Sequence, residues 1–151
     1  MQAAAAIREA AAQDVARLVQ LARAFYDEDG FTTGDTALHE HFTLLVPDPS
    51  AHVVVVLTEG EICGFALTTT GFTLESGRIA ELQDLYVRPE DRRRGLGSAL
   101  VADAVGWARG MAASSIEVVV APNGRDVRHL HRYYAARGFV DEGRRILGLP
   151  L

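Results

Sequence analysis

The chain has 151 residues, of which 48% are hydrophobic and 23% charged, an ordinary composition for one globular domain with a substantial core. The formal net charge of −5 disfavours nucleic acid and anionic membranes, so we expect neither as a partner. Cys63 is the only cysteine, which excludes an internal disulfide and a multi-cysteine metal site. No apolar run approaches the ~20 residues of a membrane helix. We expect a single domain over residues 1–151, located in the cytoplasm.

The first part of the chain predicts a short extended opening around Ile7, followed by two helices. Apolar residues recur at helical spacing over 15–25, and a second helix is expected over about 36–45, ended by Pro47. The polar stretch 27–35 between them predicts a loop.

The middle of the chain predicts three strands. Residues 51–58 and 62–72 are rich in valine, threonine and aromatic residues, and Glu59-Gly60 between them is typical of a hairpin turn. A third strand is expected over 78–87.

The last third predicts two helices, one strand and a terminal hairpin. The clearest helix covers 95–109, a strand follows over 114–122, and a helix over 126–137 is stopped by Gly138. Residues 139–151 predict the hairpin. The fold class is α/β with a mixed sheet (α+β), mostly antiparallel, of about six to seven strands flanked by about four helices.

The stretch RPEDRRRGLGS, residues 88–98, places three arginines and two glycines before the clearest helix. The first turn of a helix offers backbone N–H groups and a partial positive charge, glycines allow close approach, and arginines add permanent charge. This pattern predicts a diphosphate site. The alternative is a solvated charge run with glycines that only shape a turn.

Two other phosphate motifs do not fit. A Walker loop needs a lysine, and the chain contains none. A dinucleotide fingerprint needs a third glycine and a strand directly before the first glycine, whereas seven residues separate the 78–87 strand from Gly95.

The segment ELQDLYVRPEDRRRGLGSALV resembles the GCN5-related N-acetyltransferase (GNAT) superfamily. The family motif Q/R-x-x-G-x-G/A fits Arg92 to Gly97. Tyr134, Gly138 and Phe139 fit the tyrosine-x-x-x-glycine-phenylalanine ending of the family's last helix. The resemblance implies a GNAT-like acyl-CoA N-acyltransferase fold and acetyl-CoA as the acetyl donor.

The resemblance also implies where acetyl-CoA binds. Its pantetheine arm is expected to pair with the 78–87 strand, and its diphosphate to sit on amides ahead of the 95–109 helix. The implied residues are Leu85, Tyr86, Val87, Arg92, Arg93, Arg94, Gly95, Leu96, Gly97 and Ser98. Where the family often has an asparagine, this chain has Val127. We expect Asn123 or Arg125 to substitute, the alternative being that the contact is absent.

For catalysis, the resemblance implies that Tyr134 protonates the departing thiolate and that a backbone N–H near Leu85, at a strand bulge, polarises the carbonyl. Strand alternation places Glu81 and Gln83 on one face, where Glu81 is the expected base, directly or through water. Asp84 is expected on the opposite face, in a structural hydrogen bond.

The acceptor amine is the least specified part. Asp27, Glu28 and Asp29 fall in the region that lines the acceptor cleft in this family, together with Gln83. They would suit a cationic amine such as a polyamine, an aminoglycoside or a lysine side chain; the alternative is a solvated loop.

The leading interpretation is an N-acetyltransferase for a primary amine of a small molecule or peptide. A non-catalytic acyl-CoA-binding sensor on the same fold is the alternative, and a nucleotide-binding domain is a third. We expect no metal, because the histidines do not form ligand pairs, and a homodimer made by the terminal hairpin.

Overall fold

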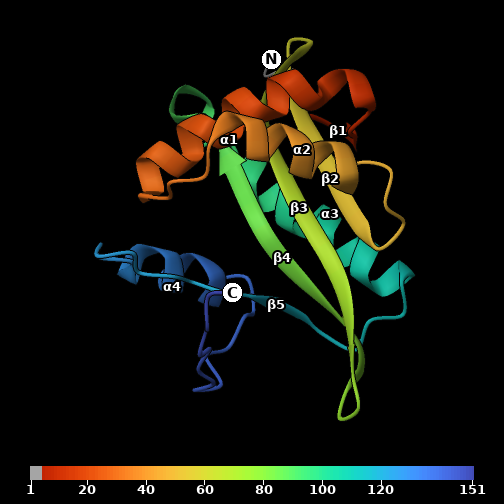
Figure 1. The fold of residues 1–151 in the computed structure, drawn as a ribbon, viewed down its shortest axis with the longest axis vertical. Helices are drawn as coiled ribbons and strands as arrows, with labels where there is room; N and C mark the ends of the chain where they lie inside the picture. Colours follow the sequence, from red (N-terminus) through yellow and green to blue (C-terminus); the bar gives the residue numbers. More distant parts are fainter. Residues whose placement is uncertain (1–4) are drawn as a thin grey trace. The chain divides into compact units, whose positions relative to one another are not determined.

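The computed structural model describes residues 5–151 (Figure 1). Its elements are, in order, β1 (Ala6–Glu9), η1 (Ala12–Asp14), α1 (Val15–Asp29), α2 (Asp35–Leu45), β2 (Ala51–Thr58), β3 (Glu61–Thr73), β4 (Gly77–Val87), η2 (Pro89–Asp91), α3 (Leu96–Gly110), β5 (Ile116–Val118) and α4 (Arg128–Ala135). They fall into two compact units, one reaching to Val119 and one over 120–151. That the chain forms a single domain stays a prediction.

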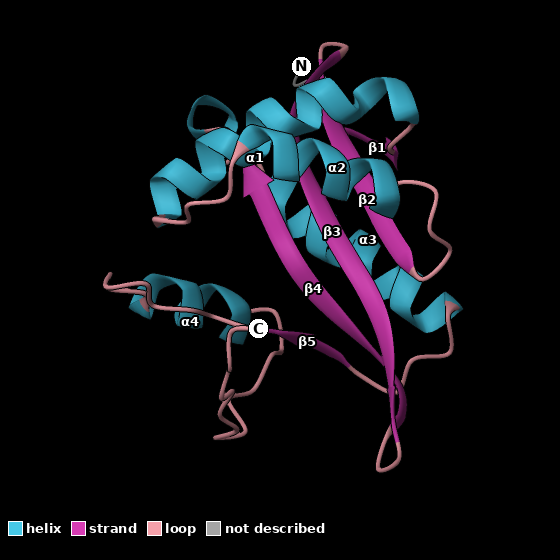
Figure 2. Cartoon of the chain, in the orientation of Figure 1, coloured by secondary structure: helices cyan, strands magenta, loops and turns pink. Residues whose placement is uncertain are grey.

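The first unit holds a five-stranded sheet in the order β1-β2-β3-β4-β5 (Figure 2). Strands β1 to β4 are antiparallel neighbours, and β5 runs parallel to β4. The predicted mixed sheet with an antiparallel meander is confirmed. Figure 1 shows α1 and α2 in front of the sheet and α3 behind it.

The sheet has five strands instead of the predicted six to seven, because residues 139–151 contain no strand. Gly143 takes a left-handed backbone with φ 72°, and its N–H donates to the Asp141 carboxylate at 2.8 Å. Side-chain turns of this kind satisfy the backbone locally. Gly148 and Pro150 also interrupt the short apolar run. The predicted terminal hairpin was therefore wrong.

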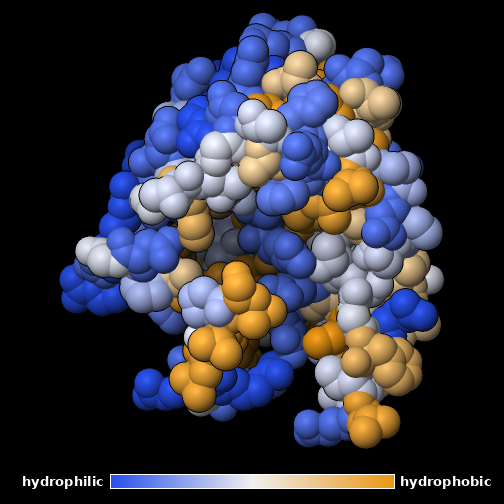
Figure 3. All heavy atoms as spheres, in the orientation of Figure 1, coloured by the Kyte–Doolittle hydropathy of each residue, from blue (hydrophilic) through white to orange (hydrophobic). Residues whose placement is uncertain are grey.

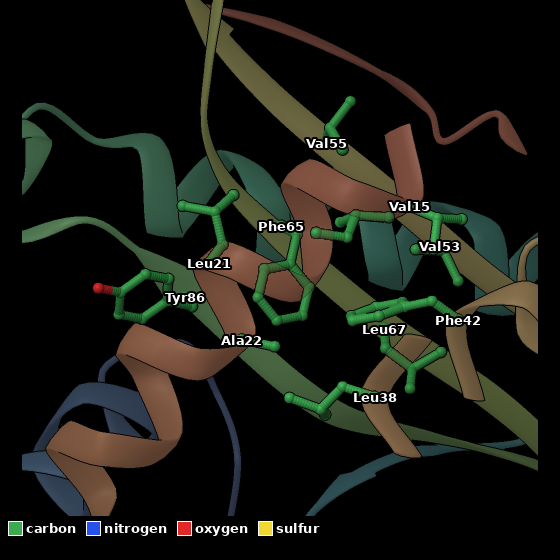
Figure 4. Packing of buried hydrophobic residues seen from close by; sticks show 11 residues of the cluster. Val15, Leu21, Ala22, Leu38, Phe42, Val53, Val55, Phe65, Leu67 and Tyr86 are labelled. Carbon is green, nitrogen blue, oxygen red and sulfur yellow. The ribbon is translucent and has the colours of Figure 1, made fainter. Parts of the chain in front are cut away.

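The core between the two front helices and the sheet is aliphatic and aromatic (Figure 4). Helices α1 and α2 contribute every third or fourth residue, and the strands contribute every second, as the helix and strand periods require. The buried members are Val15, Leu18, Leu21, Ala22, Leu38, Phe42, Val53, Val55, Phe65, Leu67 and Tyr86. This cluster packs the N-terminal half of α1, together with α2, against β2, β3 and the end of β4.

Two turns show how local sequence acts. Glu59 and Gly60 both have positive φ (51° and 78°), which suits a two-residue hairpin turn and confirms that prediction. Helix α1, in contrast, continues through Asp29 and ends at Gly30 with φ 81°, whose N–H donates to the Tyr26 carbonyl. The predicted loop over 27–35 was wrong at its start, and the acidic triplet lies in the last helical turn.

Strand β3 lies close against β4 at Gly64, which pairs with Val87. A Cβ atom on Gly64 would lie 2.4 Å from the Tyr86 carbonyl oxygen. The neighbouring Cys63 is fully buried, with its Sγ 3.5 Å from the Val56 carbonyl oxygen.

Two large apolar side chains are exposed at the far end of the β3–β4 hairpin. Phe72 and Leu74 are exposed there, and Figure 3 shows hydrophobic atoms at this lower end of the molecule. Among residues 5–151, no helix is both long and apolar enough to cross a membrane.

Candidate active site

A bulge in β4 organises the candidate site. Leu67 of β3 pairs with Asp84, and the next residue, Thr68, pairs with Leu82, so Gln83 is an extra residue without a cross-strand partner. Such a bulge bends the strand and re-aims the side chains that follow it. It lies two residues before Leu85, near which sequence reasoning placed it.

Glu81 and Gln83 share one face of the sheet, as strand alternation predicted. Glu81 pairs with Thr69, and the Gln83 amide donates to the Thr69 hydroxyl at 2.6 Å. Directly paired residues present their side chains on the same face.

Asp84 lies on this face as well, so the prediction of the opposite face was wrong. Its partner Leu67 belongs to the core beneath α1 and α2, and its Oδ1 accepts a hydrogen bond from the Tyr26 hydroxyl at 2.9 Å. The extra residue at Gln83 resets the alternation, which a regular strand would have kept. The predicted structural hydrogen bond is present.

Burial raises the pKa of the Asp84 carboxyl, and the Glu81 charge raises it further, against the lowering effect of the Tyr26 hydrogen bond. Burial, with the Asp84 charge beside it, also raises the pKa of the Tyr26 phenol. Tyr26 therefore stays protonated and donates. The face therefore holds two carboxylates, and one of them, Asp84, is bonded to the Tyr26 hydroxyl.

The outer edge of β4 is paired with another strand over only part of its length. Strand β5 pairs with it at three positions only, from Ala80 with Ile116 to Leu82 with Val118. Across residues 5–151, the sheet pairing of β4 beyond Leu82 is made with β3. The edge carrying Leu85, Tyr86 and Val87 can therefore take an extended ligand as an added strand.

The loop after β4 turns sharply into α3. Arg93 and Gly95 have positive φ (64° and 77°), and the Gly95 carbonyl accepts the first helical hydrogen bond, from Ala99. No heavy atom lies within 4 Å of a Cβ built on Gly95, so its glycine serves the backbone conformation. The N–H groups of Leu96 and Gly97 belong to the first helical turn, which favours an anion.

The three arginines of this loop have different surroundings. Arg92 binds Glu28 and the Val87 carbonyl, and Arg94 binds Asp91 at 3.3 Å. Within the described part of the chain, Arg93 alone of the three has no ion pair or side-chain hydrogen bond. The predicted cofactor residue Arg92 and the predicted acceptor residue Glu28 are thus paired with each other.

The other acidic residues of the triplet lie on the same turn of α1. Asp27 lies 3.5 Å from Arg23 one turn earlier, and Asp29 directly precedes the Gly30 cap.

Sequence reasoning missed Tyr26 and Asp84 as site residues. The sequence does not distinguish Tyr26 from a core residue, because Tyr26 follows the helical spacing of the apolar residues of α1.

Tyr134 and Asn123 lie in the second unit. The Phe139 N–H donates to the Tyr134 carbonyl, Gly138 takes φ 91°, and the Phe139 ring packs edge-on against Tyr134 at 5.4 Å. The tyrosine-glycine-phenylalanine motif is therefore a helix C-cap. Asn123 (φ 45°) forms a turn with Gly124. The catalytic role of Tyr134 and the cofactor role of Asn123 stay predictions.

Tyr133 has a packing role. Its ring lies beneath the Arg137 guanidinium, whose Cζ is 3.4 Å from the ring centroid, and its hydroxyl is buried.

Over residues 5–151, no group of three or more histidine, cysteine or acidic side chains is placed to hold a metal ion.

A sequence model of the acetyltransferase (GNAT) family matches residues 15–139. The chain belongs to this family. It is 44% identical over 68 residues to an aminoglycoside N(6')-acetyltransferase type 1 of Klebsiella aerogenes, covering 43% of this chain and 45% of that protein. It is 32% identical over 104 residues to an aminoalkylphosphonate N-acetyltransferase of Salmonella typhimurium, covering 68% of this chain and 66% of that protein. Each match spans less than two thirds of the relative.

Among solved structures, the aminoglycoside N-acetyltransferase AAC(6')-Iy in complex with CoA has a TM-score of 0.86 to this chain. The two are 16% identical, and the match covers 99% of this chain and 97% of that one. At this identity the likeness defines the fold.

Proposed function

We propose that the protein is an acetyl-CoA-dependent N-acetyltransferase that acetylates a primary amine by direct attack. The observation that carries the proposal is the bulge in β4, which puts Glu81 and Asp84 on one face beside an edge of β4 that β5 leaves open. An amine and a thioester brought together there would have a proton acceptor within the same strand.

The proposal gives each part of the candidate site a role. The N-terminus of α3 and the Arg93 side chain hold the diphosphate, and backbone groups of Leu85 to Val87 hold the arm of acetyl-CoA. Glu81 takes the proton from the attacking nitrogen. Tyr134 gives a proton to the sulfur as the carbon–sulfur bond breaks. The products are the amide and coenzyme A.

The acceptor we propose is a small molecule that carries a positive charge. Asp27 is exposed on the last turn of α1, and Glu81 and Asp84 lie on the candidate face. The relatives named for aminoglycosides and aminoalkylphosphonates support an amino-containing small molecule. Kanamycin and 2-aminoethylphosphonate are the first two probes to try.

Two measurements test the proposal. Acetyl-CoA binding is measured by calorimetry, with Gly97→Asp as the variant, because an aspartate there puts negative charge against the diphosphate. Release of coenzyme A is then followed over a panel of amines. Equal acetyl-CoA affinity in a folded Gly97→Asp protein would contradict the diphosphate site. Binding without release for any amine would support the non-catalytic acyl-CoA sensor instead.

A further inference from the structure

The side chain of Arg92 makes three kinds of contact at once. Its Nε donates to the Val87 carbonyl at 2.8 Å, and its two terminal nitrogens bind the two carboxylate oxygens of Glu28 at 2.8 and 2.9 Å. Its guanidinium also lies over the Tyr86 ring, 5.5 Å from the centroid. A forked, two-point pairing of this sort fixes geometry more strongly than a single-point ion pair.

These contacts join two segments that are far apart in the sequence. Val87 is the last residue of β4, at the end of the edge assigned to acetyl-CoA, and Glu28 lies in the last turn of α1. Two residues before Glu28, Tyr26 is bonded to Asp84. The last turn of α1 is thus fastened to β4 at the bulge and at the strand end.

The α1–β4 fastening has an apolar base. The Phe25 ring stacks on the Tyr86 ring at 5.3 Å with an interplanar angle of 8°. Arg92 lies over the same Tyr86 ring, so the guanidinium is held by an aromatic face as well as by its hydrogen bonds. Groups of the protein itself therefore hold Arg92 in position.

We propose that Arg92 is a positioning residue and not a ligand of the diphosphate. It holds the last turn of α1, with Asp27 and the Tyr26–Asp84 pair, at the place where the acceptor amine binds. The diphosphate is left to Arg93 and the first-turn amides of α3. This inference rests on the proposed function and assigns opposite roles to neighbouring arginines of one motif.

The two roles for Arg92 make opposite predictions. If Arg92 binds the diphosphate, Glu28 competes with it, and Glu28→Gln should tighten acetyl-CoA binding while Arg92→Gln weakens it. If Arg92 positions α1, both substitutions should leave acetyl-CoA affinity unchanged within about threefold and raise the KM of the amine by about fivefold. The double variant should then resemble either single variant, because both break the same contact.

A lysine at this position sharpens the comparison. Arg92→Lys keeps the positive charge but cannot make the two-point pairing together with the Nε bond. A positioning role predicts that lysine behaves like glutamine, whereas a diphosphate ligand would keep most of its affinity for acetyl-CoA. Arg8→Gln is the matched control, because Arg8 makes a two-point pair with Asp14 just before α1 begins.

The experiment measures three quantities on these variants: the Kd of acetyl-CoA by calorimetry, the KM and kcat of the best amine, and hydrogen exchange of the peptide covering 26–34. We expect faster exchange in Arg92→Gln and Glu28→Gln, and wild-type exchange in Arg8→Gln. A tenfold rise in the Kd of acetyl-CoA in Arg92→Gln, with a lower Kd in Glu28→Gln, would overturn the inference. If the wild-type protein binds no acetyl-CoA, the proposed function fails, and the exchange comparison alone decides whether Arg92 holds α1.

Discussion

Glu81 and Asp84 lie on the same face of β4, so the identity of the proton acceptor becomes a choice between two carboxylates. We expect Glu81 to be the base, because Asp84 is engaged by the Tyr26 hydroxyl. Glu81→Gln should lower kcat/KM at neutral pH by about 10²-fold or more, and less at high pH, where the free amine is already deprotonated. The rate–pH profiles of Glu81→Gln and Asp84→Asn measure this. A wild-type profile in Glu81→Gln together with a large loss in Asp84→Asn would move the base to Asp84.

Asp84 also has a predicted effect on stability. Burial raises the pKa of Asp84, so the folded chain holds this proton more tightly than the unfolded chain. The free energy of unfolding therefore falls as pH rises above the ordinary value of about 3.9. Asn keeps an oxygen for the Tyr26 hydroxyl and carries no charge. We expect the stability of Asp84→Asn relative to the wild type to increase between pH 4 and 7, measured by urea unfolding. A difference independent of pH would contradict the raised pKa.

At the scale of single elements, the close approach of β3 to β4 depends on Gly64. A Cβ there would lie 2.4 Å from the Tyr86 carbonyl oxygen and 3.1 Å from the Val87 Cα, so the backbone must move. Gly64→Ala should lower the free energy of unfolding by about 1–3 kcal/mol, as overpacking does elsewhere.

Gly71 offers a matched control on the same strand, because no heavy atom lies within 4 Å of a Cβ built on it. Gly71→Ala should leave stability unchanged or raise it by about 0.5–1 kcal/mol, since alanine loses less backbone entropy on folding. Urea unfolding of both variants measures the contrast. Equal effects of the two substitutions would mean that the strand spacing adjusts without cost.

The elements differ in how far the sequence predicts them. The Glu59-Gly60 turn and α3 follow from local signals. The turn is a short polar pair ending in glycine, and both of its residues take a positive φ. Helix α3 is predicted by apolar residues at helical spacing. The bulge at Gln83 follows from cross-strand register, which no short stretch of sequence encodes. The polar composition of residues 27–35 predicts a loop, but the first three of these residues form the last turn of α1. Contacts of Tyr26 and Glu28 with residues 58 and 64 positions away favour the helix instead.

At the scale of the whole molecule, the sequence predicts the backbone elements of the candidate site but not the contacts between its side chains. The turn before α3 and the strand β4 follow from local patterns, and the structure contains both elements. Their roles in binding a diphosphate and in catalysis stay predictions. Arg92 and Glu28 were both named, but for two different ligands, because nothing in the sequence says that they meet. Side-chain partners brought together by the fold are visible only in the structure.

The homodimer also stays a prediction at this scale, and the exposed apolar residues of the C-terminal segment support it. Val140, Ile146, Leu147 and Leu149 are each at least 73% exposed, more apolar surface than a short segment usually leaves to water. Light scattering should give about twice the chain mass of 16.3 kDa, and Leu147→Asp should lower it toward a single chain. A monomeric mass for the wild type would contradict the dimer.

The burial of Cys63 has a practical consequence for every assay of this protein. A transferase of the proposed kind sets free one coenzyme A thiol in each turnover, and a disulfide reagent detects that thiol by its colour. Because the protein's only cysteine thiol, that of Cys63, is fully buried in β3, it does not react with the reagent while the strand keeps its place in the sheet. In a solution without substrate, the same reagent measures local unfolding. The rate at which it labels Cys63 reports how often the centre of the sheet opens.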